Sequence, residues 1–189
     1  MEPSTIIKTE RLILKMIDES YAGRVLDFLQ RNSSNLQQWE PLRADEYYTV
    51  EFQQDLIRTS MSKIQSGELF RVWLFRKEDE AEQTIIGCIT LEQIERGCFL
   101  SCRLGYKLDV EERNKGYMTE ALQVVIRYAF DGMDLHRIEA TIMPANMPSL
   151  RVVQKLGFHH EGVSRNYLKI NGQWEDHTRW ALLNERMER

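Results

Sequence analysis

The chain has 189 residues, of which 42% are hydrophobic and 29% charged, the composition of an ordinary soluble globular protein. A net charge of −4 argues against direct nucleic-acid binding, which usually leaves a basic footprint. No secretory signal opens the sequence, and no apolar run reaches the roughly 18 residues of a membrane span. Together with the absence of a low-complexity linker, these features predict one cytoplasmic domain over residues 1–189, without a membrane partner.

The first part of the chain predicts one strand and two helices. Alternating residues at 11–16 predict the strand, and Asp18 or Ser20 can cap the helix that follows, which carries Val25 on its apolar stripe. A longer helix is predicted over residues 49–65, where apolar residues recur at helical spacing and a glycine follows.

The middle of the chain is rich in β-branched and aromatic residues. It predicts strands at 69–75, 84–94 and 98–108, separated by polar turns, and hence an antiparallel meander. Gly87 and Gly105 lie inside these strands, where glycine often marks a bulge or a close approach of another backbone.

Beyond residue 108 the hydrophobic period changes from two to nearly four. The change predicts a helix over 119–130, followed by a strand at 137–143 that runs parallel to the strand before the helix. A short helix over 146–156 and a hairpin that turns at Asn171-Gly172 complete the predicted elements.

The loop before the predicted helix at 119–130 reads Arg113-Asn114-Lys115-Gly116. Main-chain N–H groups at a helix start are unpaired within the helix and lie at the positive end of its dipole, so they suit a pyrophosphate. Gly116 lets that backbone approach phosphates closely, and Arg113 and Lys115 add positive charge. The loop is neither a Walker A nor a Gly-x-Gly-x-x-Gly motif. An exposed loop that binds nothing is the alternative.

Cysteines and histidines point to no metal site. Cys88, Cys98 and Cys102 are odd in number and have apolar neighbours, which predicts buried free thiols. The four histidines show no helical pairing and no Cys-x-x-Cys companion, so no metal is expected.

Two motifs resemble the GNAT superfamily of N-acetyltransferases. Arg113-x-x-Gly116-x-Met118 resembles its Arg/Gln-x-x-Gly-x-Gly/Ala acyl-CoA loop, with Met118 in place of the commoner glycine or alanine. Pro144-x-Asn146-x-x-Ser149 resembles the other half of the same cofactor site. Within the superfamily, Thr9-Glu10-Arg11-Leu12-x-Leu14 resembles the start of many RimJ/RimL-type members. Three further segments resemble the RimJ branch of ribosomal-protein-alanine N-acetyltransferases: Trp39-Glu40-Pro41, Arg137-Ile138 and Tyr167-Leu168-x-Ile170-Asn171-Gly172-x-Trp174-x-Asp176-His177.

The resemblance implies a fold and a cofactor site. The fold is α+β, an α/β/α sandwich whose mixed, mostly antiparallel sheet of six to seven strands contains a splayed parallel pair. Acetyl-CoA is the implied co-substrate, without a metal. The implied cofactor contacts are Leu108, Val110, Arg113, Asn114, Lys115, Gly116, Tyr117, Met118, Thr119, Asn146 and Ser149.

The implied reaction is direct attack of an amine on the acetyl thioester. Ser149 is the first candidate for the acid that protonates the leaving thiolate, and Tyr167 is the second; a serine that merely caps its helix is the alternative. Trp39, Glu40 and Tyr167 are the candidate acceptor contacts. No general base stands out: the candidates are Glu40, Glu92, Glu161 and Asp176, or a water chain.

The acceptor itself stays open at this point. A protein N-terminus, most simply that of a ribosomal protein, is the leading hypothesis, and a small amine such as an aminoglycoside or a polyamine is the second. A non-catalytic acyl-CoA sensor is a third, since a fold does not fix a function. Both a monomer and a homodimer fit the sequence.

Overall fold

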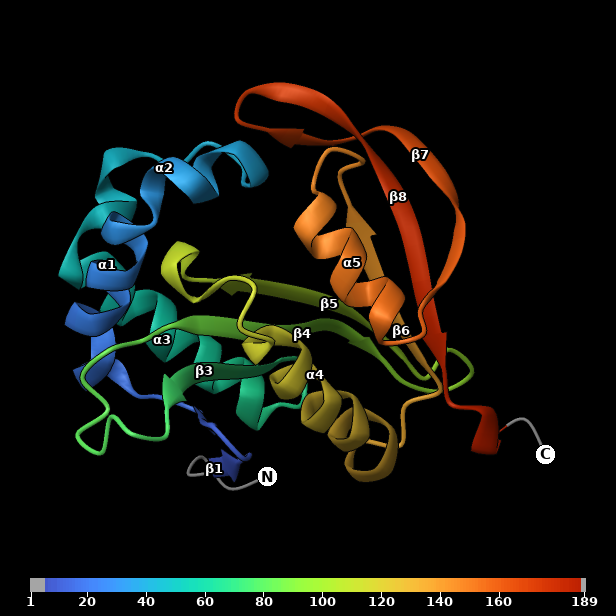
Figure 1. Ribbon diagram of the computed structural model, residues 1–189, viewed down its shortest axis with the longest axis horizontal. Helices are drawn as coiled ribbons and strands as arrows, with labels where there is room; N and C mark the ends of the chain where they lie inside the picture. Colours follow the sequence, from blue (N-terminus) through green and yellow to red (C-terminus); the bar gives the residue numbers. More distant parts are fainter. Residues whose placement is uncertain (1–5, 188–189) are drawn as a thin grey trace.

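A computed structural model describes residues 6–187, which form one layered α+β unit (Figure 1). The described strands make one eight-stranded sheet with the order β1-β2-β3-β4-β5-β6-β8-β7. They are β1 (Ile6–Lys8), β2 (Leu12–Lys15), β3 (Phe70–Arg76), β4 (Gly87–Glu95), β5 (Ser101–Leu108), β6 (Arg137–Ile142), β7 (His159–Ile170) and β8 (Gln173–Leu183). The predicted fold class is confirmed. The extra strand is the three-residue edge strand β1, which is too short to show a pattern in the sequence.

Two groups of helices cover the two faces of the sheet. The helices are α1 (Ala22–Arg31), α2 (Ser33–Leu36), α3 (Val50–Gln65), α4 (Tyr117–Arg127) and α5 (Met147–Lys155). One core cluster joins α1 and α3 to Trp73, Phe75 and Cys88 of the sheet, and a larger cluster packs α4 and α5 on the opposite face. In Figure 1, α1 to α3 lie on one side of the molecule, and the hairpin of β7 and β8 arches over the other.

Local signals place the helix boundaries well. Asp18 accepts a hydrogen bond from the N–H of Ser20 at 2.9 Å, and Thr49 caps α3 through the N–H of Phe52 at 3.3 Å. Asn146 caps α5, as its residue type predicts. The helix predicted over 119–130 begins earlier, at Tyr117, because Gly116 with φ of 82° supplies the turn into it.

The sheet opens between β5 and β6. These strands run parallel, as predicted, but pair only from Ser101 to Arg103 opposite Arg137 to Glu139. From Leu104 to Leu108 the edge of β5 that faces β6 therefore has no strand partner. A bulge in β4, where Gln93 has φ of 50°, accompanies this opening.

The hairpin of β7 and β8 turns at Asn171-Gly172, as predicted, with φ of 43° and 81°. The N–H of Asn171 donates to the carbonyl oxygen of Glu40 at 2.9 Å. The tip of the hairpin is thereby held against the segment between α2 and α3, which lies more than 100 residues earlier in the sequence. This contact brings two parts of the RimJ-like pattern together.

The cysteine prediction is correct for two of the three thiols. Cys88 and Cys102 are buried, and burial raises the pKa of Cys102 to about 12. Cys98 is exposed, because it lies in the turn between β4 and β5 rather than in a strand. Among residues 6–187, no helix is long and apolar enough to cross a membrane.

Candidate active site

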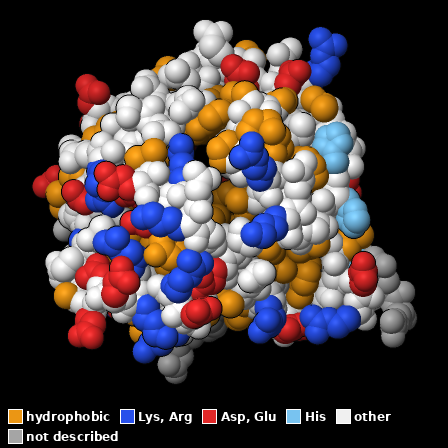
Figure 2. Space-filling view, in the orientation of Figure 1, with side chains coloured by type: hydrophobic (Ala, Val, Ile, Leu, Met, Phe, Trp, Pro, Cys, Tyr) orange, Lys and Arg blue, Asp and Glu red, His pale blue; other side chains and the backbone are white. Residues whose placement is uncertain are grey.

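A cleft of about 700 Å³ fills the opening between β5 and β6; we call it the central cleft. Figure 2 shows it as a hollow with apolar atoms inside and lysine and arginine side chains around it. Its lining includes Trp39, Glu40, Leu108, Arg113, Asn114, Gly116, Tyr117, Met118, Thr119, Asn146 and Ser149, all of which the sequence singles out. Val110, Lys115 and Tyr167 are not part of this lining.

The start of α4 forms one end of the cleft. Gly116 is in the left-handed region, and no side chain caps the helix, so its first N–H groups are unpaired. A Cβ atom built on Gly116 would meet only the Nη2 atom of Arg11, at 3.4 Å. These N–H groups and the positive end of the helix dipole fit an anionic phosphate.

The Thr9-Glu10-Arg11 segment braces this helix start. Glu120 of α4 accepts from the Thr9 hydroxyl at 2.6 Å, from the Arg11 N–H at 2.9 Å and from the Arg11 Nε at 2.7 Å. The Arg11 Nη1 also donates to the carbonyl oxygen of Lys115 at 2.9 Å. Burial alone would raise the pKa of Glu120, but these donors outweigh it and hold the pKa below its usual value.

Two predicted contacts of the loop are engaged elsewhere. The Lys115 ammonium pairs with buried Glu112 at 2.9 Å, which also accepts from Arg76. The Val110 N–H donates to the side-chain oxygen of buried Asn32 at 2.9 Å. Their contacts with a cofactor therefore remain predictions. The Val110 carbonyl oxygen is engaged as well, because it accepts from the Arg113 N–H at 3.4 Å.

Met118 departs from the usual glycine or alanine without obstructing the loop. Its side chain is 5% exposed and belongs to the core cluster beneath α4. The larger residue is accommodated by the core rather than by the phosphate side of the helix.

Ser149 is held by its main chain, and its hydroxyl remains available. Its N–H donates to Asn146 at 3.2 Å, and its carbonyl oxygen accepts from the Tyr106 hydroxyl at 3.0 Å. The Ser149 hydroxyl has no hydrogen-bond partner among the described residues. Asn146, not Ser149, caps α5, so capping does not account for this serine.

Tyr106 is a site residue that the sequence analysis missed. It lines the cleft and connects β5 to α5 across the opening of the sheet. Burial raises the pKa of its hydroxyl, which stays protonated. Arg151 and Lys155 of α5 also line the cleft and were missed; their lysine or arginine type on the polar side of a helix is not a distinctive signal.

The opposite wall carries Glu40 and Lys107. The Lys107 ammonium lies 2.7 Å from the Glu40 carboxylate, and both side chains are largely buried. Burial alone would lower the pKa of Lys107, but Glu40 outweighs it and the net pKa is raised. Glu40 therefore faces a permanent cation, which restrains it from acting as a free base.

His177 is a further cleft residue that was not among the predicted site residues. It is 4% exposed and lines the central cleft, and the Tyr167 ring packs on it with centroids 5.4 Å apart. Its Nδ1 lies 3.1 Å from the carbonyl oxygen of Glu175. Since a carbonyl oxygen only accepts, this bond puts the proton on Nδ1 and leaves the Nε2 lone pair free. The available signal was its place at the end of the RimJ-like motif.

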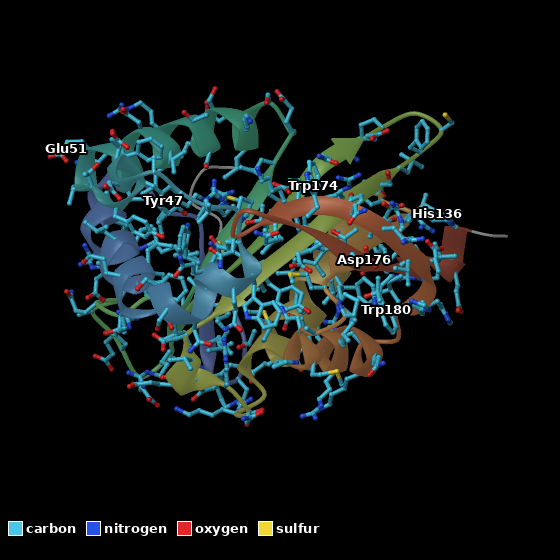
Figure 3. All side chains as sticks on the ribbon, turned by 90° about the horizontal axis from the view of Figure 1, so that it is seen from above. Tyr47, Glu51, His136, Trp174, Asp176 and Trp180 are labelled. Atoms are coloured by element: carbon cyan, nitrogen blue, oxygen red, sulfur yellow. The ribbon has the colours of Figure 1, made fainter. Side chains whose placement is uncertain are left out.

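The other predicted carboxylates lie outside the cleft lining. Glu161 pairs with Arg137, and Asp176 accepts from the Asn166 N–H at 2.8 Å. Glu92 is exposed on β4. Figure 3 shows Asp176 and Trp174 on the hairpin, across from Tyr47 on the helical side.

A second, smaller cavity of about 230 Å³ lies between α3 and the sheet; we call it the inner cavity. Lys107 lines both this cavity and the central cleft. Arg43, Arg71 and Lys107 contribute three positive charges to its lining, in which no described residue is acidic. The net charge of −4 therefore does not reflect the local charge here.

Comparison with known proteins decides the family. A family model described as an acetyltransferase (GNAT) domain matches residues 11–159. The chain belongs to the GNAT acetyltransferase family. It is an acyl-CoA N-acetyltransferase, as its sequence predicts, and the fold of the GNAT relatives is the one described above.

Its relatives include characterised and uncharacterised acetyltransferases. The chain is 38% identical over 179 residues to the probable N-acetyltransferase YjcK of Bacillus subtilis, covering 95% of this chain and 97% of that protein. It is 34% identical over 180 residues to the [ribosomal protein uS5]-alanine N-acetyltransferase of Escherichia coli, covering 95% and 91%.

Solved structures agree. The ribosomal-protein-S5-alanine acetyltransferase of Vibrio fischeri superposes with a TM-score of 0.90 at 32% identity, covering 96% of this chain and 97% of that one. Mycobacterium smegmatis RimJ in complex with CoA-disulfide shares the fold, with a TM-score of 0.89 at 23% identity.

Proposed function

We propose that this GNAT enzyme transfers the acetyl group of acetyl-CoA to the N-terminal α-amine of a ribosomal protein. Two relatives above 30% identity carry names that describe this activity on ribosomal protein S5. An acceptor of this kind would place the enzyme in the cytoplasm. Monomer and homodimer remain equally compatible with this function.

The charge of the inner-cavity lining supports a peptide rather than a small polyamine as the acceptor. Glu40 balances the charge of Lys107, but Arg43 and Arg71 form no ion pair with a carboxylate among residues 6–187. Two such cations disfavour a polyamine or an aminoglycoside, whose several positive charges need acidic partners. A peptide presents a single α-amine and an otherwise variable chain. Exposed Leu42, Leu168 and Trp174, near the tip of the hairpin, add an apolar rim against which a peptide can pack.

On the donor side, the start of α4 is proposed to hold the pyrophosphate through its unpaired N–H groups, with Arg113 nearby. Arg151 and Lys155 supply further positive charge along α5. The unpaired edge of β5 from Leu104 to Leu108 offers main-chain groups to the pantetheine and an N–H to polarise the thioester oxygen.

His177 is the proposed general base. Its Nε2 takes one proton from the acceptor ammonium, which leaves a neutral amine and an imidazolium. The amine nitrogen then bonds to the thioester carbon while the carbon–sulfur bond breaks. One proton of the nitrogen is transferred to the departing thiolate through the Ser149 hydroxyl, and the imidazolium returns its proton to water.

This assignment also favours an α-amine over a lysine side chain. The reference pKa of an α-amine is about 7.7–8.0, within two units of an ordinary imidazole, whereas that of a lysine is about 10.4. Proton transfer to an imidazole is thus much less uphill from the α-amine.

The decisive experiment measures CoA release with a free-thiol assay on a panel of acceptors. We expect turnover with peptides that copy the N-termini of ribosomal proteins, and little with spermidine or kanamycin. Turnover on the small amines but not on the peptides would overturn the proposal. Tight acetyl-CoA binding by calorimetry without CoA release from any acceptor would instead identify an acyl-CoA sensor.

A further inference from the structure

The inner cavity holds an arginine whose charge is not balanced within the described chain. Arg71 of β3 is half-buried, with its Nε donating to the Thr90 hydroxyl at 3.1 Å and its Nη1 to the Ser60 hydroxyl at 2.8 Å. Within residues 6–187 it forms no ion pair with a carboxylate, and its Nη2 has no hydrogen-bond partner. Placing a guanidinium partly out of water against neutral hydroxyls costs free energy unless an anion joins it.

The surroundings of Arg71 fix its position without neutralising it. The Ser60 hydroxyl donates to the carbonyl oxygen of Leu56 at 2.7 Å, so only its lone pairs face the guanidinium. The two hydroxyls hold the planar group from α3 and from β4, leaving one edge toward the cavity. A carboxylate is the ligand whose geometry matches such a guanidinium edge.

The cavity is in line with the central cleft. Arg71 pairs with Thr90, and Thr90 pairs with Gly105 of β5, so these three residues follow one another across the sheet on one face. Neighbouring strands lie about 4.8 Å apart, and the Arg71 side chain already reaches to Thr90.

Gly105 leaves this row without a side chain on β5. It is exposed, and a Cβ atom built on it would meet no atom within 4 Å. Close packing therefore does not explain a glycine in the middle of β5. Its missing side chain leaves the cleft-lining surface of β5 open next to Thr90.

We propose that the inner cavity is an acceptor subsite that binds a carboxylate of the acceptor through Arg71. This inference rests on the proposed function, because the carboxylate is carried by the same peptide whose α-amine enters the central cleft. The span from β5 to the guanidinium corresponds to one or two extended residues at about 3.4 Å each. The acidic side chain therefore belongs to the second or third residue of the acceptor.

The test compares pairs of acceptor peptides that differ at one position. One peptide of each pair carries Asp or Glu at its second or third residue, and the other carries the corresponding amide, Asn or Gln. For the wild-type enzyme we expect about a tenfold higher kcat/KM for the acidic peptide at one of these positions, mostly through a lower KM. A difference of this size corresponds to one charge-assisted hydrogen bond. Arg71→Gln should remove this preference by lowering kcat/KM for the acidic peptide to the value for the amide peptide. Arg71→Glu should reverse it in favour of a Lys-bearing peptide.

Arg58→Gln is the matched control, since Arg58 lies on the exposed side of α3 and pairs with Asp55. Equal kcat/KM for acid and amide peptides would overturn the subsite, as would a preference that survives in Arg71→Gln. A uniform loss of activity on all peptides in Arg71→Gln would assign Arg71 a structural role instead.

The two proposals fail in different ways. If no peptide is acetylated, the proposed function is wrong. The anion subsite is then tested separately, by the effect of succinate on the Tm. Succinate should raise the Tm of the wild-type protein and not that of Arg71→Gln; no difference between the two would remove the anion site as well.

Discussion

The two sides of the central cleft are built in different ways. The proposed donor side is made by contiguous segments: the loop from Arg113 to Thr119 and the helix from Asn146 to Lys155. The proposed acceptor side is assembled from distant ones: Trp39 and Glu40, Lys107 of β5, His177 of β8 and, behind them, Arg71 of β3. The donor side relies on main-chain donors and helix dipoles, whereas the acceptor side relies on individual side chains. Changes to the first should therefore alter CoA affinity, and changes to the second should alter turnover and acceptor choice.

The largest effect is expected on the acceptor side. His177→Gln keeps a polar side chain but removes the free imidazole nitrogen, and we expect kcat to fall by about 100-fold or more, as for the loss of a general base. CoA affinity by calorimetry should not change.

His159→Gln is the control, because His159 is exposed at the start of β7. A wild-type kcat in His177→Gln would rule out His177 as the base and leave a water chain.

On the donor side, Gly116→Val tests the phosphate-binding loop. Valine is strained at φ of 82° and places a branched side chain at the helix start, so we expect about 100-fold weaker CoA binding from roughly 3 kcal/mol of strain and lost contacts. Calorimetry with CoA measures this directly.

Gly97→Val introduces the same residue at φ of 71° in the turn between β4 and β5, away from the cleft. If both variants bind CoA as the wild type does, the loop is not the phosphate site.

These two sides also differ in what the sequence could predict. The donor loop is a local pattern, in which Gly116 and the helix start are adjacent in the chain, and both lie where they were expected. Ser149 follows for the same reason, since its cap Asn146 is three residues away. The fold was predictable because strands and helices carry periodic patterns, except for the three-residue strand β1.

On the acceptor side, Trp39 and Glu40 were predicted and line the cleft, whereas the other members meet only through the sheet and were missed. Arg71, Thr90 and Gly105 share a row through the register of three strands, and nothing in the spacing of the sequence reveals that register. His177 is recognisable only once its Nδ1 contact with Glu175 and its place on the cleft are known. The ion pair of Lys115 with Glu112 likewise depends on the position of Glu112, which is buried beside Arg76 of β3.

Ser149→Ala tests the point at which the two sides meet. A thiolate with a reference pKa near 8.5 leaves fairly well without an acid, so we expect only about a tenfold decrease in kcat. CoA affinity should stay near wild type, because the main-chain contacts of Ser149 are kept. Steady-state kinetics with an acetyl-CoA titration separates the two quantities.

Ser62→Ala, on the exposed face of α3, is the control for the same substitution. An unchanged kcat in Ser149→Ala would transfer the acid role to Tyr167, Tyr106 or water, and Tyr106→Phe would then distinguish Tyr106 from the rest.

The smallest effect concerns the brace behind the donor loop. Glu120→Gln weakens the contacts with Thr9 and Arg11, and because Arg11 is 44% exposed we expect a loss of about 1 kcal/mol, or a Tm lower by about 2–4 °C. The folded-state pKa of Glu120 is lowered, so its stabilisation is complete above the unfolded pKa and disappears as the pH falls through the folded value. The Tm difference between wild type and Glu120→Gln, measured by calorimetry from neutral pH downward, should therefore shrink in acid.

Glu78→Gln is the control, because the Glu78 side chain is 78% exposed beside Arg76; it should show neither the loss of Tm nor the pH dependence. A Tm difference that grows in acid would mean that Glu120 is stabilised in its protonated form, and the brace would then not be an ion pair.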